Sequence, residues 1–194
     1  MVIRKGQAWG SEGTLAPDAP VVASDRALAE AVAEGAPQVR PTAGDLAATL
    51  GVNDRTNARA AQMLLPVDAL RVTLDGSEGT LAVAHVVVGA LRRPRTLVMN
   101  AAFLGAWNPA PRAHPGDGRL DIVDFEVGIV DWWKAKRRLP TGTHVPHPGV
   151  RVRSARRWER DLEGRTPVRI DGRTVIRASH IVIEVVDEAF IAGV

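Results

Sequence analysis

The feature that most constrains the fold is a series of short strand-like runs, separated by turns rich in glycine and proline, that begins at Val67. Leu70, Val72 and Leu74 alternate with polar neighbours, which is the period-two pattern of a half-buried strand. Similar runs recur at residues 81–88, 96–104, 120–127, 150–158, 168–170, 175–176 and 180–186. Repeated short strands without long intervening helices favour a mainly β sandwich or open barrel over a doubly wound parallel sheet.

The first two runs are predicted to form a hairpin. Residues 75–79 carry the turn chemistry Asp-Gly-Ser-Glu-Gly, and the second run is almost entirely apolar around His85, as in a more fully buried strand. The neighbouring Gly76-Ser77-Glu78-Gly79-Thr80 resembles a phosphate-binding loop only superficially. No helix N-terminus is expected beside it to receive a phosphate, so we interpret it as part of the hairpin turn.

Helices are predicted to be few and short. One begins at the capping residue Ser24 and ends at Gly35, a second turn covers residues 45–50, and a third runs from Asp131 to Leu139. The third has Lys and Arg side chains near its C-terminus, where they complement the helix dipole. We therefore divide the chain into an N-terminal extension with short helices, residues 1–66, and a principal β domain, residues 67–194.

Composition limits the chemistry and the compartment. The chain has 194 residues and no cysteine, which excludes disulfides, thiolate metal sites and a cysteine nucleophile. No run approaches the roughly 20 apolar residues of a membrane span, and the N-terminus does not lead into an apolar signal core. We expect one core of ordinary size in a soluble, cytoplasmic protein.

The net charge of +3 is modest, but five arginines fall within ten residues, at positions 151, 153, 156, 157 and 160. A basic face suits an anionic partner, whether a phospholipid headgroup, a nucleic acid or a phosphate-bearing substrate. A solvated arginine-rich surface explains the pattern equally well. Tyr is absent and there are three Phe, so a base-stacking platform would depend on the five Trp residues, and nucleic acid is the weakest of these partners.

Four motifs follow one another along the second part of the chain. They are Asn100-Ala101-Ala102-Phe103-Leu104-Gly105 with Pro109-Ala110-Pro111, then Gly116-Asp117-Gly118-Arg119-Leu120-Asp121, His147-Pro148-Gly149-Val150, and Val168-Arg169-Ile170-Asp171-Gly172. Their order and spacing resemble those of the diacylglycerol kinase, sphingosine kinase and bacterial lipid kinase superfamily. The resemblance covers roughly residues 67–190. It implies a β-sandwich of the lipid-kinase C-terminal type, which holds acyl chains and faces a separate nucleotide-binding domain across a cleft. Residues 1–66 are too short and too poor in βαβ pattern for that second domain.

The resemblance also assigns site residues. It places a structural or regulatory Mg²⁺ at Asp117, with main-chain carbonyls near His114 and Arg119, and hard oxygen ligands on a turn suit this ion. It implies substrate contacts for Asn100, Asp171 and Gly172. An Asp-Gly pair is also an ordinary turn, and this interpretation of Asp117 and Asp171 stays open.

One position departs from the family. Arg173 occupies the place where an acidic general base is expected, and an arginine cannot accept a proton at physiological pH. This departure argues against kinase activity of the chain alone, in addition to the absent nucleotide-binding half.

Other candidates have two interpretations each. Trp107 could line the mouth of a cleft or pack in the core, and Trp132-Trp133 could rest at a membrane interface or cap the core. His144 and His147 form too small a set for a zinc site in a loop that contains Pro146, so a structural loop is favoured.

Three functions follow from the sequence. The first is a stand-alone lipid-kinase-like domain that binds a lipid or other amphiphile without catalysis and without a cofactor. The second is the substrate-binding half of a split lipid kinase, completed by a separate nucleotide-binding chain and Mg²⁺. A nucleic-acid-associated β protein is a distant third, because charge alone discriminates poorly.

Overall fold

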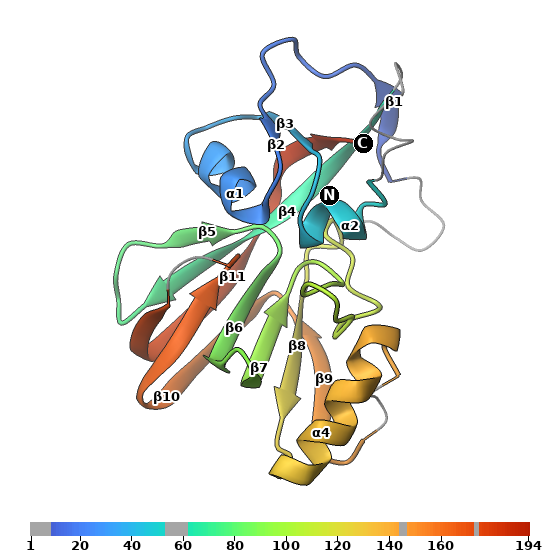
Figure 1. Cartoon of the computed structure of the whole chain (residues 1–194). Coiled ribbons are helices and arrows are strands. Elements are labelled where there is room, and N and C mark those ends of the chain that lie inside the picture. The colour runs from blue at the N-terminus through green and yellow to red at the C-terminus, as the bar shows by residue number, and fades with distance from the viewer. Residues whose placement is uncertain (1–8, 53–61, 144–146, 173–174) are drawn as a thin grey trace.

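The computed structural model describes residues 9–52, 62–143, 147–172 and 175–194. The predicted mainly β architecture is confirmed, and the strands of these residues, eleven in all, form one sheet (Figure 1). The strands are β1 Ser11–Gly13, β2 Val21–Val22, β3 Gln38–Pro41, β4 Gln62–Leu74, β5 Thr80–Ala82, β6 His85–Ala90, β7 Arg93–Met99, β8 Leu120–Phe125, β9 Val150–Ala155, β10 Arg157–Ile170 and β11 Ile176–Gly193. The helices are α1 Asp25–Ala33, α2 Asp45–Thr49 and α4 Ile129–Arg138, and the 3-10 turn η1 Leu139–Thr141 follows α4. No helix in these described ranges is long and apolar enough to cross a membrane.

The main path of the sheet runs β1-β4-β11-β10-β6-β7-β8-β9, and all neighbours along it are antiparallel. The longest strand of this path is β11, which pairs with β4 from Ile181↔Leu74 to Gly193↔Leu64. A bulge between Val186 and Phe190 interrupts this pairing. Glu188 adopts a positive φ of 46° in the bulge, a conformation that kinks the strand locally.

The sheet folds over on itself. Strands far apart along the path contribute to one apolar core: Val72 from β4, Ile122 from β8 and Ile183 from β11 belong to the same buried cluster. The two layers of the expected sandwich are therefore parts of one continuous sheet that encloses the core between them.

The N-terminal segment joins the same sheet. Its strands β2 and β3 pair in parallel with α1 between them, and β3 pairs in parallel with β11 through Ile191↔Gln38. A separate apolar cluster includes Leu28 of α1, Leu46 of α2 and Phe190 of β11. This β2-α1-β3 unit is much smaller than a doubly wound domain, and the predicted boundary between residues 66 and 67 falls inside β4.

Two predicted strands are each split in the structure. Run 81–88 forms β5, which pairs with β4 as the expected hairpin, and β6, which pairs with β10 and β7. The break occurs because the backbone N–H groups of Val83, Ala84 and His85 donate hydrogen bonds to the carboxylate of Asp171. These groups therefore cannot donate to a neighbouring strand. Run 150–158 divides at Arg156, where the chain passes from β9 beside β8 to β10 beside β11.

Candidate functional site

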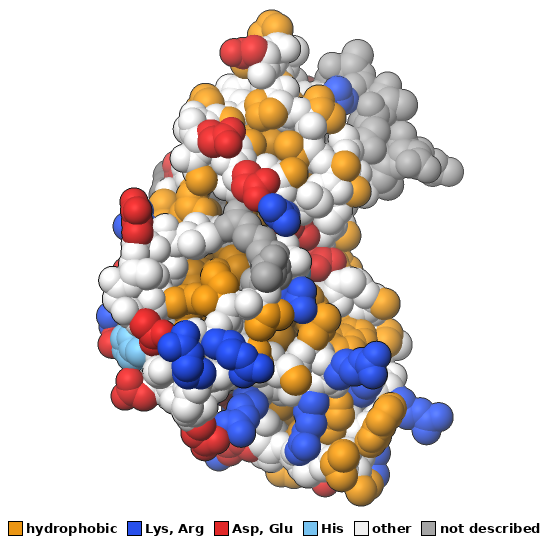
Figure 2. Space-filling model, turned by 60° about the vertical axis from the view of Figure 1, so that its left-hand side comes forward, with side chains coloured by type: hydrophobic (Ala, Val, Ile, Leu, Met, Phe, Trp, Pro, Cys, Tyr) orange, Lys and Arg blue, Asp and Glu red, His pale blue; other side chains and the backbone are white. Residues whose placement is uncertain are grey.

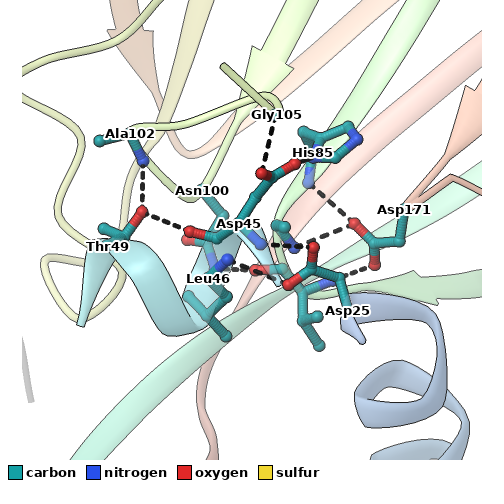
Figure 3. A network of polar contacts seen from close by, with 11 residues as sticks. Asp25, Asp45, Leu46, Thr49, His85, Asn100, Ala102, Gly105 and Asp171 are labelled. Atoms are coloured by element: carbon teal, nitrogen blue, oxygen red, sulfur yellow. Dashed lines mark hydrogen bonds and ion pairs between the residues drawn. The ribbon is translucent and has the colours of Figure 1, made fainter. Parts of the chain in front are cut away.

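A cluster of buried and half-buried polar side chains lies where α1, α2 and the start of β6 meet (Figure 3). It contains Asp25, the first residue of α1, Asp45, the first residue of α2, and His85, the first residue of β6. Asp171, which follows β10, and Asn100, which follows β7, complete it. Five polar residues from five segments therefore converge, and apolar side chains of the neighbouring elements pack around them.

Asp171 organises the backbone of this region. Its Oδ2 accepts a hydrogen bond from the N–H of Val83 at 2.6 Å, and its Oδ1 accepts from Ala84 and His85 at 3.0 and 2.9 Å. Its φ of 43° aims the side chain back at β6. Burial raises the pKa of Asp171 to about 7, against the lowering effect of the three N–H donors. This aspartate closes a turn and holds three buried N–H groups.

The carboxylates of Asp25 and Asp45 also accept hydrogen bonds from backbone N–H groups. The carboxylate of Asp25 accepts from the N–H groups of Asp45 and Leu46 at 2.8 and 3.0 Å, and Asp45 Oδ1 accepts from the N–H of Gly105 at 2.8 Å. Burial raises the pKa of both aspartates, and the neighbouring charge of Asp45 adds to the rise at Asp25. Gly44 is required beside them, because its φ is +116° and a Cβ there would lie 2.6 Å from Asp25 Oδ1.

His85 faces these carboxylates. Its Nδ1 lies 3.4 Å from Asp45 Oδ2, and the residue is only 4% exposed. Burial lowers the pKa of His85 to about 4, with Asp25 opposing the shift, so the imidazole is neutral at pH 7.

Asn100 connects this cluster to the Asp117 turn. Its Nδ2 donates to the carbonyls of Val83 and Asp68, both at 2.8 Å. Asp68, a buried residue of β4, accepts in turn from the N–H of Gly118 at 2.7 Å and from that of Glu188 at 2.8 Å. The predicted substrate residue Asn100 is thus 1% exposed and bonded to the main chain.

The predicted magnesium residues lie elsewhere, in a pocket of about 700 Å³. Asp117, Arg119 and Asp121 line it together with residues 109–112 of the Pro-Ala-Pro segment. Asp117 Oδ1 accepts from the N–H of Arg119 at 2.9 Å, and the charge of Asp117 contributes to a raised pKa of Asp121 that is due first to burial. Two carboxylates on one pocket wall fit the hard oxygen donors that Mg²⁺ takes, so the Mg²⁺ assignment remains a prediction that the donor set permits.

The ring of Trp107 contacts helix α4. It forms an edge contact with Trp132 at 6.1 Å between ring centroids, and Lys136 lies 5.7 Å above its ring. Trp132 is buried and donates from Nε1 to the carbonyl of Arg92 at 3.0 Å, which fastens α4 to the β6–β7 turn. Gly172 is exposed beside Asp171, and Arg173 lies outside the described residues.

The arginines of the predicted basic face are all paired with acidic residues. Arg151 pairs with Glu126, Arg153 and Arg160 with Asp124, Arg156 with Asp187, and Arg157 with Glu159 and Glu184. Charge neutralisation across neighbouring strands therefore reduces the field that an anionic polymer would meet.

His147 has a structural contact, since its Nδ1 accepts from the N–H of Gly149 at 3.1 Å at the entry to β9. His144 lies outside the described residues.

Sequence reasoning missed Asp25, Asp45 and Asp68 as partners of the predicted residues. The first two carried only the signal of an acidic helix start, and Asp68 lay in a run interpreted as an alternating strand. The available signal was His85, a single titratable side chain within an apolar β-branched run.

Comparison with protein families finds no match, and no curated protein matches either. The chain is similar to solved structures of diacylglycerol kinases from Bacillus anthracis str. Sterne. One is 15% identical with a TM-score of 0.59, over 81% of this chain and 69% of that chain. A second is also 15% identical, with a TM-score of 0.57, over 81% of this chain and 66% of that chain. Four ordered motifs and this structural similarity agree, and the chain has the fold of diacylglycerol kinases over four fifths of its length.

Proposed function

We propose that the chain is a lipid-kinase-like domain that binds a lipid or another amphiphile at a membrane surface and does not transfer phosphate by itself. The observation that carries this proposal is the outer face of α4, made of Ile129, Val130 and Trp133 in a diacylglycerol-kinase fold. These side chains are 61%, 63% and 60% exposed, while Trp132 on the opposite side is buried. Exposed apolar residues grouped on one helix face are typical of a docking surface.

Charge on the same helix favours a lipid headgroup. Lys136, Arg137 and Arg138 occupy the last turn, and Lys136 also lies 5.3 Å above the ring of Trp133. Apolar side chains in the first half and cations in the second suit a helix that lies in the headgroup region of an anionic membrane. Figure 2 shows Lys and Arg side chains over the lower half of the molecule, beside both acidic and exposed apolar side chains.

The polar cluster supports the absence of catalysis. The carboxylate of Asp171, a residue only 4% exposed, accepts three backbone N–H groups, so it serves the main chain rather than a substrate hydroxyl. A general base must reach the substrate hydroxyl with a free acceptor. The turn at residues 76–79 connects β4 to β5, so it opens no helix of the kind that cradles phosphates.

The second candidate, half of a split lipid kinase, is favoured by the Asp117 pocket. Asp68 and Arg156 both bond to Gly118, so the turn is held firmly at the pocket wall. With a nucleotide-binding partner chain, Asp117 and Asp121 would hold Mg²⁺ there.

Vesicle co-sedimentation tests the membrane proposal. The chain should bind vesicles that contain phosphatidylserine and should bind neutral vesicles more weakly. Replacing Ile129 and Trp133 by serine removes two side chains worth about 1 kcal/mol each at an interface, which lowers partitioning about 30-fold. Val21→Ser, at an equally exposed apolar position on β2, serves as the matched control and should bind like wild type. Equal binding by all variants would contradict the assignment of α4.

A phosphoryl-transfer assay with diacylglycerol, ATP and Mg²⁺ tests the second part. We expect no product from the chain alone. Turnover that Asp117→Asn abolishes would instead establish catalysis, and turnover only after addition of a partner chain would favour the split enzyme.

A further inference from the structure

The cluster of Asp25, Asp45 and His85 has the arrangement of a metal site. One ligand atom from each residue, a carboxylate oxygen or an imidazole nitrogen, lies within 4.8 Å of the other two. The three residues come from α1, α2 and β6, and Figure 3 shows the side chains pointing toward one another. Carboxylates often cluster without an ion, so the histidine is the distinguishing ligand of this group.

The imidazole of His85 is buried without a hydrogen-bond partner for Nδ1 among the residues that the structure describes. Leaving a buried polar nitrogen unpaired costs about 1–3 kcal/mol, which native structures rarely tolerate without a reason. The nitrogen faces Asp45 Oδ2 at 3.4 Å, which is long for a hydrogen bond. Two ligands at about 2.0–2.1 Å from one tetrahedral ion are themselves about 3.4 Å apart, so this spacing suits a shared metal.

The carboxylates are positioned for the same purpose. Asp45 Oδ1 accepts from the N–H of Gly105, which fixes the side chain and leaves Oδ2 toward His85. Both oxygens of Asp25 accept one N–H, and each keeps a second lone pair. Outer hydrogen bonds of this kind orient metal ligands and strengthen them.

We propose that Asp25, Asp45 and His85 bind one Zn²⁺ ion. A neutral imidazole with two carboxylates suits a borderline transition metal better than Mg²⁺, which prefers oxygen ligands alone. Three protein ligands leave a fourth position for water or a ligand atom. The ion would tie the N-terminal helices to β6, and it is independent of both lipid binding and the Mg²⁺ prediction at Asp117.

Metal titration of the full chain tests the proposal. After treatment with a chelator, the protein should bind one Zn²⁺ per chain by calorimetry. One equivalent of Co²⁺ should give the visible absorption of a four-coordinate site, and Zn²⁺ should bleach it. Asp45→Asn replaces the ligating oxygen and should weaken binding at least tenfold, while Asp117→Asn should bind as wild type does.

His85→Gln tests the contribution of the nitrogen ligand and should also lose the Co²⁺ absorption. Circular dichroism verifies that each variant is folded. If His85→Gln unfolds, the Zn²⁺ affinity of Asp45→Asn serves as the test of the site. The proposal is wrong if the wild-type chain binds no stoichiometric Zn²⁺. It is equally wrong if Asp45→Asn binds normally, or if Asp117→Asn removes the ion, which would place the metal in the other pocket.

Discussion

Replacing Asn100 by aspartate distinguishes a structural residue from a substrate-binding one. The Nδ2 group donates to two buried carbonyls, of Val83 and Asp68, each at 2.8 Å. An ionised carboxylate would put a negative oxygen in its place, facing both acceptors. The folded state therefore accepts only the protonated form of the introduced carboxyl group, and the pKa of that group rises in the folded state.

The magnitude follows from these two bonds. A protonated carboxyl can donate to one carbonyl only, so the lost bond costs about 1–3 kcal/mol. Unfolded aspartate has a pKa of about 3.9, so keeping the group neutral costs about 1.4 kcal/mol for each pH unit above this value, or about 4 kcal/mol at pH 7. Because the folded state holds a proton that the unfolded state releases, stability is retained near pH 4 and lost as the pH rises. The total at pH 7 is comparable to the stability of a whole domain.

Urea unfolding followed by tryptophan fluorescence at pH 5 and pH 7 measures this effect. The penalty of Asn100→Asp relative to wild type should grow by about 3 kcal/mol between these values. Gln38→Glu is the control, since its half-buried side chain accepts from the N–H of Ala16 and glutamate can do the same. If the two substitutions gave equal and pH-independent penalties, the side chain of Asn100 would not face two carbonyls, and the reasoning would fail.

Two further substitutions test local contacts. Asp75→Asn keeps an acceptor for the N–H groups of Ser179 and His180 but removes the charge whose hydrogen bonds lower the pKa of Asp75. Wild type should therefore be the more stable at pH 7, with the difference lost as the pH falls below about 4; a constant difference in urea midpoint would contradict this. Trp132→Phe leaves the carbonyl of Arg92 unpaired and should cost about 1–3 kcal/mol in chemical unfolding, whereas Trp133→Phe on the exposed side should cost less than about 0.5 kcal/mol.

The strands were predictable because their signal is local. Period-two alternation predicted the position of β4, and apolar runs between turn residues predicted β6, β8 and part of β11. Ser24 correctly marked the start of α1, where its side chain accepts from the N–H of Ala27. Strand breaks were not predictable, because the break before β6 depends on Asp171, which lies 88 residues from Val83 in the sequence.

The candidate site was only partly predictable for the same reason. The motifs that carry the family resemblance drew attention to Asn100, Asp117 and Asp171, whose site roles stay predictions. Their partners Asp25, Asp45 and Asp68 come from segments without such a motif, and a sequence shows neither burial nor convergence in space. The structure joins them through backbone N–H groups, which carry no residue-specific signal at all.

The measurement that tests the central claim most directly is native mass spectrometry of the freshly purified chain, followed by organic extraction. We expect a stoichiometric acyl-chain lipid that co-purifies with the wild-type protein and that the Ile129→Ser, Trp133→Ser double variant retains less well. An apo mass without any extractable lipid, together with no binding to vesicles, would contradict a lipid-binding role.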